Sequence, residues 1–132
     1  MTSAKLSLDI GIVTGDAPPM LAFYGNVLEI PCVGEVTLPG LGVLRKFQYG
    51  ASVIKILAPF DPPQPAPRTQ RFSQAAGLRY LTLMVADLAQ TFERCREAGA
   101  KVLVEITPVR PGVTAAMVED PDGNAVELMQ VG

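Results

Sequence analysis

The chain has 132 residues, of which 48% are hydrophobic and 18% are charged, and its formal net charge is -2. This length fits one domain with a single cooperative core. Lys and Arg form no cluster and no apolar run approaches the roughly 20 residues that cross a bilayer, so we expect no nucleic-acid partner and no membrane.

The first half of the chain predicts a strand, a helix and three further strands. Residues 6–13 alternate between apolar and polar, with Leu8 on an apolar face that should pack against a helix. Asp16 stands at an N-cap position, and the prolines after it suit a first helical turn. Turn residues such as Gly50 separate the later strands. The predicted elements are a strand over 6–13, a helix over 17–28 and strands over 32–38, 43–49 and 51–57.

The second half predicts the same order of elements after a proline-rich segment. Residues 58–76 lose the pattern, and their prolines favour a stiff, extended linker. Gly99 ends the second helix, and the Pro and Gly of residues 120–124 mark a tight hairpin turn. The predicted elements are a strand over 78–85, a helix over 88–98 and strands over 101–106, 113–119 and 125–130.

The two halves keep a common register. Asp16 and Asp87 are 71 positions apart, and Asp9 and Tyr80 are separated by the same interval. The alternative is that any two amphipathic segments of this kind look alike. Because several positions coincide, we interpret the chain as two copies of one β-α-β-β-β unit.

Two motifs in this repeat resemble the vicinal oxygen chelate superfamily, which includes glyoxalase I, bleomycin resistance proteins and extradiol dioxygenases. They are Glu119-Asp-Pro-Asp-Gly-Asn-Ala-Val-Glu-Leu128, which is similar to the closing hairpin of that superfamily, and Phe23-Tyr24 with Val27-Leu28. The resemblance implies an α+β fold in which two tandem βαβββ modules form a cup-shaped mixed sheet with helices outside. We expect a single domain, 1–132, with modules 1–57 and 77–132 and a linker over 58–76.

The resemblance also places four metal-ligand positions, which fall on Asp9, Lys55, Tyr80 and Glu127. Metal-dependent members of the superfamily usually have His, Glu or Gln, His and Glu there, and this chain contains no histidine. A protonated lysine repels a divalent cation and offers it no lone pair. We therefore predict no metal and no cofactor.

Strand parity predicts which side chains share the face of these four residues. A mixture of charged, small and thioether groups suits a small, partly apolar organic molecule. The catalytic candidates are Lys55, Asp9, Tyr80 and Glu127. The predicted ligand-binding residues are Ser7, Val53, Leu57, Thr82, Met84 and Met129.

Three interpretations of this face remain open. In the first, a metal-independent isomerase, epimerase or lyase acts alpha to a carbonyl: Lys55 holds the developing negative charge, Asp9 or Glu127 moves a proton, and Tyr80 orients the substrate. In the second, the chain sequesters a drug or metabolite without chemistry, like the bleomycin-resistance branch. In the third, Lys55 pairs with Glu127 and Asp9 with Tyr80, and these pairs only fill the cup.

The remaining expectations concern location, assembly and cysteine chemistry. The start of the chain lacks the features of a signal peptide, so we expect a cytoplasmic protein. The resemblance implies a homodimer. Cys32 and Cys95 have no Cys-x-x-Cys spacing, which favours reduced thiols that serve packing.

Overall fold

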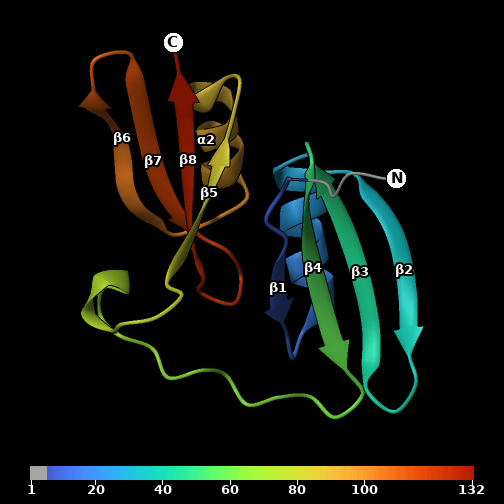
Figure 1. Ribbon diagram of the computed structural model, residues 1–132. Helices are drawn as coiled ribbons and strands as arrows, with labels where there is room; N and C mark the ends of the chain where they lie inside the picture. The colour runs from blue at the N-terminus through green and yellow to red at the C-terminus, as the bar shows by residue number, and fades with distance from the viewer. Residues whose placement is uncertain (1–5) are drawn as a thin grey trace. The chain divides into compact units, whose positions relative to one another are not determined.

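The computed structural model describes residues 6–132 and divides into two compact units, Met1–Pro65 (unit 1) and Ala66–Gly132 (unit 2). The Met-Thr-Ser-Ala-Lys start, from which we predicted location, lies outside the described residues. Each unit contains one sheet and helical segments (Figure 1). The elements of unit 1 are β1 (Ile10–Val13), α1 (Ala17–Ala22), the π-helix η1 (Phe23–Val27), β2 (Cys32–Leu38), β3 (Gly42–Tyr49) and β4 (Ser52–Pro59). The elements of unit 2 are the 3-10 helix η2 (Phe72–Gln74), β5 (Tyr80–Met84), α2 (Leu88–Glu97), β6 (Val102–Arg110), β7 (Val113–Glu119) and β8 (Ala125–Val131).

The two sheets have the same topology. The strand order is β1-β4-β3-β2 in unit 1 and β5-β8-β7-β6 in unit 2. In each sheet the first strand pairs in parallel with the last, and the other neighbours are antiparallel. This repetition confirms the predicted α+β fold with two tandem βαβββ modules. The single-domain boundaries and the cup remain predictions.

Each sheet buries one face against its own helix. In unit 1, Ile54 and Ile56 of β4 and Phe47 of β3 are at most 3% exposed. A Cβ added at Gly25 of η1 would lie 3.2 Å from the Phe47 ring, so this glycine allows the helix to approach the sheet. In unit 2 the corresponding apolar layer is formed by Leu83, Val118, Val126 and Leu128 with Leu88, Phe92 and Cys95 of α2.

The first helix spans the predicted residues but changes its winding. Leu28 N–H bonds to the Phe23 carbonyl at 2.9 Å, five residues back, as a π-helix requires. The chain then turns at Glu29, a non-glycine residue with a φ of 57°. Helix 17–28 is therefore confirmed in extent, while its second half is π rather than α.

The two predicted helix caps differ. The Asp87 carboxylate accepts the Gln90 N–H at 3.1 Å, as an N-cap should. The side chain of Asp16 makes no capping bond, because Pro18 and Pro19 occupy the positions whose N–H groups a cap would bind. Instead, the buried Thr14 hydroxyl accepts the Asp16 N–H at 3.1 Å.

Several predicted boundaries and two packing roles were wrong. The strand predicted over 6–13 begins only at Ile10, because the Asp9 carboxylate takes the Val53 N–H where backbone pairing would continue. Leu8 is accordingly 85% exposed rather than packed. The predicted linker loses its first residues to β4, which pairs with β3 as far as Pro59, and contains η2. Both cysteines are free, but Cys32 lies exposed beside a bulge in β2, and only Cys95 is buried.

Candidate functional site

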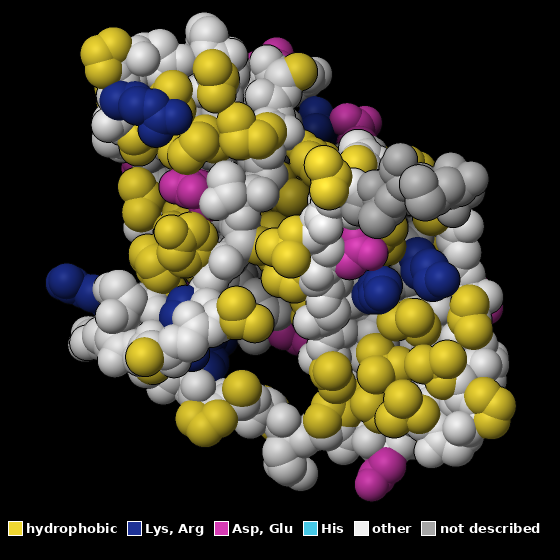
Figure 2. Space-filling view, in the orientation of Figure 1, with side chains coloured by type: hydrophobic (Ala, Val, Ile, Leu, Met, Phe, Trp, Pro, Cys, Tyr) yellow, Lys and Arg dark blue, Asp and Glu magenta, His cyan; other side chains and the backbone are white. Residues whose placement is uncertain are grey.

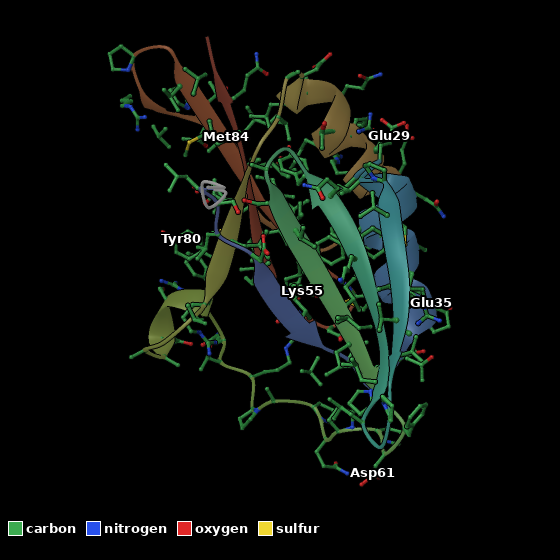
Figure 3. The ribbon with its side chains drawn as sticks, turned by 45° about the vertical axis from the view of Figure 1, so that its right-hand side comes forward. Glu29, Glu35, Lys55, Asp61, Tyr80 and Met84 are labelled. Carbon is green, nitrogen blue, oxygen red and sulfur yellow. The ribbon has the colours of Figure 1, made fainter. Side chains whose placement is uncertain are left out.

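The candidate residues of unit 1 lie on the face of its sheet opposite the helix, here called the open face of unit 1. Val53, Lys55 and Leu57 alternate along β4 with the buried Ile54 and Ile56, and all three are half-buried. Figure 3 shows Lys55 on β4. Parity along β4 was therefore predicted correctly.

Asp9 lies next to this face but outside the strand. Its Oδ1 accepts a hydrogen bond of 2.8 Å from the Val53 N–H, which fixes the carboxylate beside the first residues of β4. Asp9 is exposed, as is Ser7 before it. The structure thus brings Asp9 together with Val53, whereas Ser7 has no strand to orient it.

Sequence reasoning missed a second lysine on the open face of unit 1. Lys46 of β3 is the direct antiparallel partner of Lys55. This pairing follows from a two-residue turn at Gly50-Ala51, which pairs Tyr49 with Ser52 and so fixes every later pair of the hairpin. We had predicted a one-residue separation at Gly50, which gives a different register.

The candidate residues of unit 2 also share one face of their sheet, here called the open face of unit 2. Thr82 of β5 is the register partner of Glu127 of β8, and its hydroxyl donates to Glu127 Oε1 at 2.7 Å. Tyr80 and Met84 come from the two ends of β5 (Figure 3) and are 55% and 50% exposed. Met84 is the register partner of Met129. These five residues therefore lie on one face of the adjacent strands β5 and β8.

Tyr80 is held by a second aromatic side chain. Its ring meets Phe72 of η2 edge to face, with ring centroids 5.6 Å apart. Arg79 bonds through Nε to the Phe72 carbonyl at 3.2 Å. The segment before β5, predicted to be part of a linker, therefore positions one of the candidate residues.

The groups whose pKa values burial raises are not among the candidate residues. Burial raises the pKa of the Cys95 thiol to about 11, and it also raises the pKa of Tyr49. Cys95 lies under α2, on the helix side of the sheet in unit 2. A surface hollow of unit 2 lies at the β6–β7 hairpin and is lined by residues 108–114 and Gly132, which are not candidate residues either.

The glyoxalase/bleomycin resistance protein/dioxygenase superfamily model matches residues 8–128. The chain belongs to this superfamily. The matched span includes parts of both units and both motifs from which we inferred the resemblance. The predicted family is confirmed.

Two relatives and two solved structures of this superfamily's fold illustrate the similarity. A lactoylglutathione lyase of Salmonella typhimurium is 42% identical over 122 residues, covering 88% of this chain and 85% of the relative. A probable lactoylglutathione lyase of Synechocystis sp. is 30% identical over 127 residues, covering 90% of each chain. A glyoxalase family protein of Bacillus cereus aligns with a TM-score of 0.78 at 16% identity, over 98% of this chain and 99% of that one. TnmS3, an antibiotic binding protein of Streptomyces, aligns with a TM-score of 0.70 at 18% identity, over 100% and 98%.

The four residues that we predicted to stand at the superfamily's metal-ligand positions are a poor donor set for a divalent metal ion. In unit 1 they are Asp9, whose Oδ1 is already bonded to backbone, and Lys55, which faces another ammonium group at Lys46. In unit 2 they are Tyr80 and Glu127, whose Oε1 accepts the Thr82 hydroxyl. Two adjacent lysines repel a cation and cannot coordinate it while protonated.

Proposed function

We propose that this chain binds a small, partly apolar organic molecule on the open faces of its sheets and that this binding needs neither a metal nor a cofactor. The observation that carries the proposal is Lys55. It is half-buried between Val53 and Leu57, and within the described part of unit 1 it forms no ion pair. A cation kept beside apolar surface is positioned to hold an oxygen atom of a ligand whose carbon atoms cover the neighbours.

The open face of unit 2 supports the same proposal. Glu127 and Thr82 offer a hydrogen-bonded polar pair, and Met84 and Met129 offer adaptable apolar contact beside it. TnmS3, which shares the fold, is described as an antibiotic binding protein. We infer that this chain uses the fold in a comparable way, with Ser7 at the edge of unit 1 and the exposed Tyr80 in unit 2 as additional contacts.

A ligand screen tests the proposal. We expect compounds with one polar group on an apolar body to raise the melting temperature of chelator-treated protein and to be recovered unaltered by mass spectrometry. Lys55→Met keeps the length of the side chain without its charge, so it should weaken the hits, whereas Lys101→Met, at an exposed lysine of unit 2, should not. A broad screen without any ligand would show the proposal to be wrong.

A second candidate is a metal-independent isomerase, epimerase or lyase acting alpha to a carbonyl. It is favoured by the relatives named lactoylglutathione lyase and by the place of Asp9 next to the strand that carries Lys55. Lys55 would hold the carbonyl oxygen while negative charge develops, and Asp9, on the same unit, would move the proton from the neighbouring carbon.

Substitution distinguishes this enzyme from a binding protein. Lys55→Ala and Asp9→Asn should each lower turnover of an identified substrate by at least about a hundredfold. Unchanged turnover in both variants would remove these residues from the mechanism. Turnover that disappears with a chelator and returns only with a divalent metal would contradict metal independence.

We also propose that the protein is a homodimer in the cytoplasm. Val104, Ile106 and Val109 of β6, at one end of the strand order, are 41–50% exposed, and a second copy could cover them. Light scattering should give twice the mass of the chain, and Ile106→Lys should reduce it to the monomer. A wild-type monomer at all concentrations would contradict the assembly. Within residues 6–132, no helix has the length and apolar character to span a membrane.

A further inference from the structure

Lys46 and Lys55 form a like-charge pair that the fold itself does not explain. They are direct partners on the antiparallel strands β3 and β4, so their side chains leave the same face with Cβ atoms about 5 Å apart. Like charges in this position destabilise a sheet. Within the described part of unit 1 neither lysine has an ion-pair partner, since the ion pair on that sheet joins Arg45 to Glu35.

The two lysines lie in a row with a glycine at each end. Gly11 of β1 is the partner of Lys55, and Gly34 of β2 is the partner of Lys46, so the row crosses all four strands. A Cβ added at Gly11 would meet no atom within 4 Å, and one at Gly34 would meet only Lys46 Cδ, at 3.8 Å. Both ends of the row are therefore open, and bare backbone flanks the two charges.

The next row on the same face is entirely apolar. It consists of Val13, Leu57, Leu44 and Val36, which are register partners across the same four strands. Val13 is 54% exposed and Val36 is 40% exposed, and the other two are half-buried. Figure 2 shows dark-blue side chains over the sheet of unit 1, next to a broad group of hydrophobic side chains.

We propose that the open face of unit 1 binds an organic anion. The charged group of the ligand lies over the Lys46–Lys55 pair and relieves its repulsion, and the apolar body covers the row from Val13 to Val36. This inference rests on the proposed function and specifies the ligand class: an acidic head on an apolar body, rather than a neutral or cationic molecule. Lys46 is then a specificity-determining residue equal in importance to Lys55.

The test compares two dyes that share one apolar body. Anilinonaphthalene sulfonate carries an anionic group, and N-phenylnaphthylamine has the same rings without it. Folded wild-type protein should bind the sulfonate at least about tenfold more tightly, and this preference should diminish as salt is added. Lys46→Gln and Lys55→Gln should each weaken sulfonate binding about fivefold and leave the neutral dye unaffected. Lys101→Gln removes one charge from unit 2 and should change neither.

The melting temperature distinguishes a ligand-binding role of the two lysines from a structural one. Because each Gln variant removes a like-charge contact, its melting temperature should equal or exceed that of the wild type. Lower melting temperatures in both variants would show that the lysines stabilise the sheet and would overturn the inference.

The remaining outcomes separate this inference from the proposed function. Equal binding of the two dyes, or sulfonate binding that survives in the double variant, overturns the anion preference while ligand binding stands. If neither dye binds and the broad screen also finds no ligand, both proposals are wrong.

Discussion

Arg68 reaches from the proline-rich segment to the end of β7, where its Nη2 donates to Glu119 Oε1 at 2.8 Å. The same guanidinium lies against the β7–β8 turn, so that a Cβ added at Gly123 would be 2.7 Å from Arg68 Cζ. One arginine thus connects a segment without regular structure to the hairpin that carries the superfamily's closing motif.

Replacing Gly123 should reveal this contact. Gly123→Ala forces a side chain onto a residue with a φ of 90° and into the Arg68 guanidinium, and we expect a loss of about 1–3 kcal/mol in the free energy of unfolding. Arg68→Ala alone should lose less than about 1 kcal/mol, because its ion pair is partly exposed. In urea titrations, Gly123→Ala should be less harmful when Arg68 is already alanine.

A matched glycine provides the control for this cycle. Gly112 has a φ of 78°, but an added Cβ would meet nothing within 4 Å. Gly112→Ala should therefore show the backbone strain alone and no coupling to Arg68. Equal coupling at both glycines would rule out the contact as its source.

Asp120 should be the most sensitive residue of the β7–β8 turn. It is 4% exposed, and its carboxylate accepts the backbone N–H groups of Asp122 and Asn124 at 3.0 and 2.9 Å and the Asn124 amide at 2.8 Å. Asp120→Ala leaves these donors without their acceptor and should lower the free energy of unfolding by about 2–4 kcal/mol. Asp122→Ala, at an exposed position, should change it by less than about 0.5 kcal/mol. Similar losses in chemical denaturation would contradict this role.

The two repeat-related aspartates should differ in stability effect. Asp87→Ala removes the bond to the Gln90 N–H and should cost about 1 kcal/mol, the usual value of an N-cap. Asp16→Ala removes no capping bond, so its effect should be within a few tenths of a kcal/mol. Thermal unfolding of both variants measures the difference, and an equal loss would mean that Asp16 caps its helix after all.

Stability should fall as the pH rises above about 9. Unfolding exposes the Cys95 thiol, whose pKa returns from about 11 to its ordinary value near 9.0. Between these values the unfolded thiol loses its proton while the folded one keeps it. The free energy of unfolding should therefore fall by on the order of 2 kcal/mol by about pH 11. The raised pKa of Tyr49 acts in the same direction.

Substitutions can identify the group that causes this loss of stability at high pH. Cys95→Ala should flatten the decline between pH 9 and pH 11, whatever it does to stability at neutral pH, and Tyr49→Phe should flatten it further. Cys32→Ala, at the exposed thiol, should leave the profile of the wild type unchanged. A Cys95→Ala protein with the full decline would show that another group causes it.

Local patterns in the sequence were sufficient for the repeat, the order of elements and the superfamily. Alternation along 51–57 placed Lys55 on the correct face, and the spacing of Asp16 and Asp87 identified two copies of one unit. Such features depend on residues close together in the chain, where strand and helix periods decide which side a residue faces. Even the missing cap at Asp16 could have been predicted, since Pro18 and Pro19 have no N–H.

Only the tertiary structure decided which residues become neighbours across strands. The position of Lys46 opposite Lys55 depends on a two-residue turn, and an error of one residue in that turn moves a side chain to the other face. The contact of Arg68 with Glu119 joins residues 51 positions apart, and nothing local indicates it. The sequence by itself therefore determined the fold and its repeat, because these follow from local periodicity. The Lys46–Lys55 pair, from which we infer an anionic ligand, depends on the register between β3 and β4, because pairing between strands is a property of the folded chain.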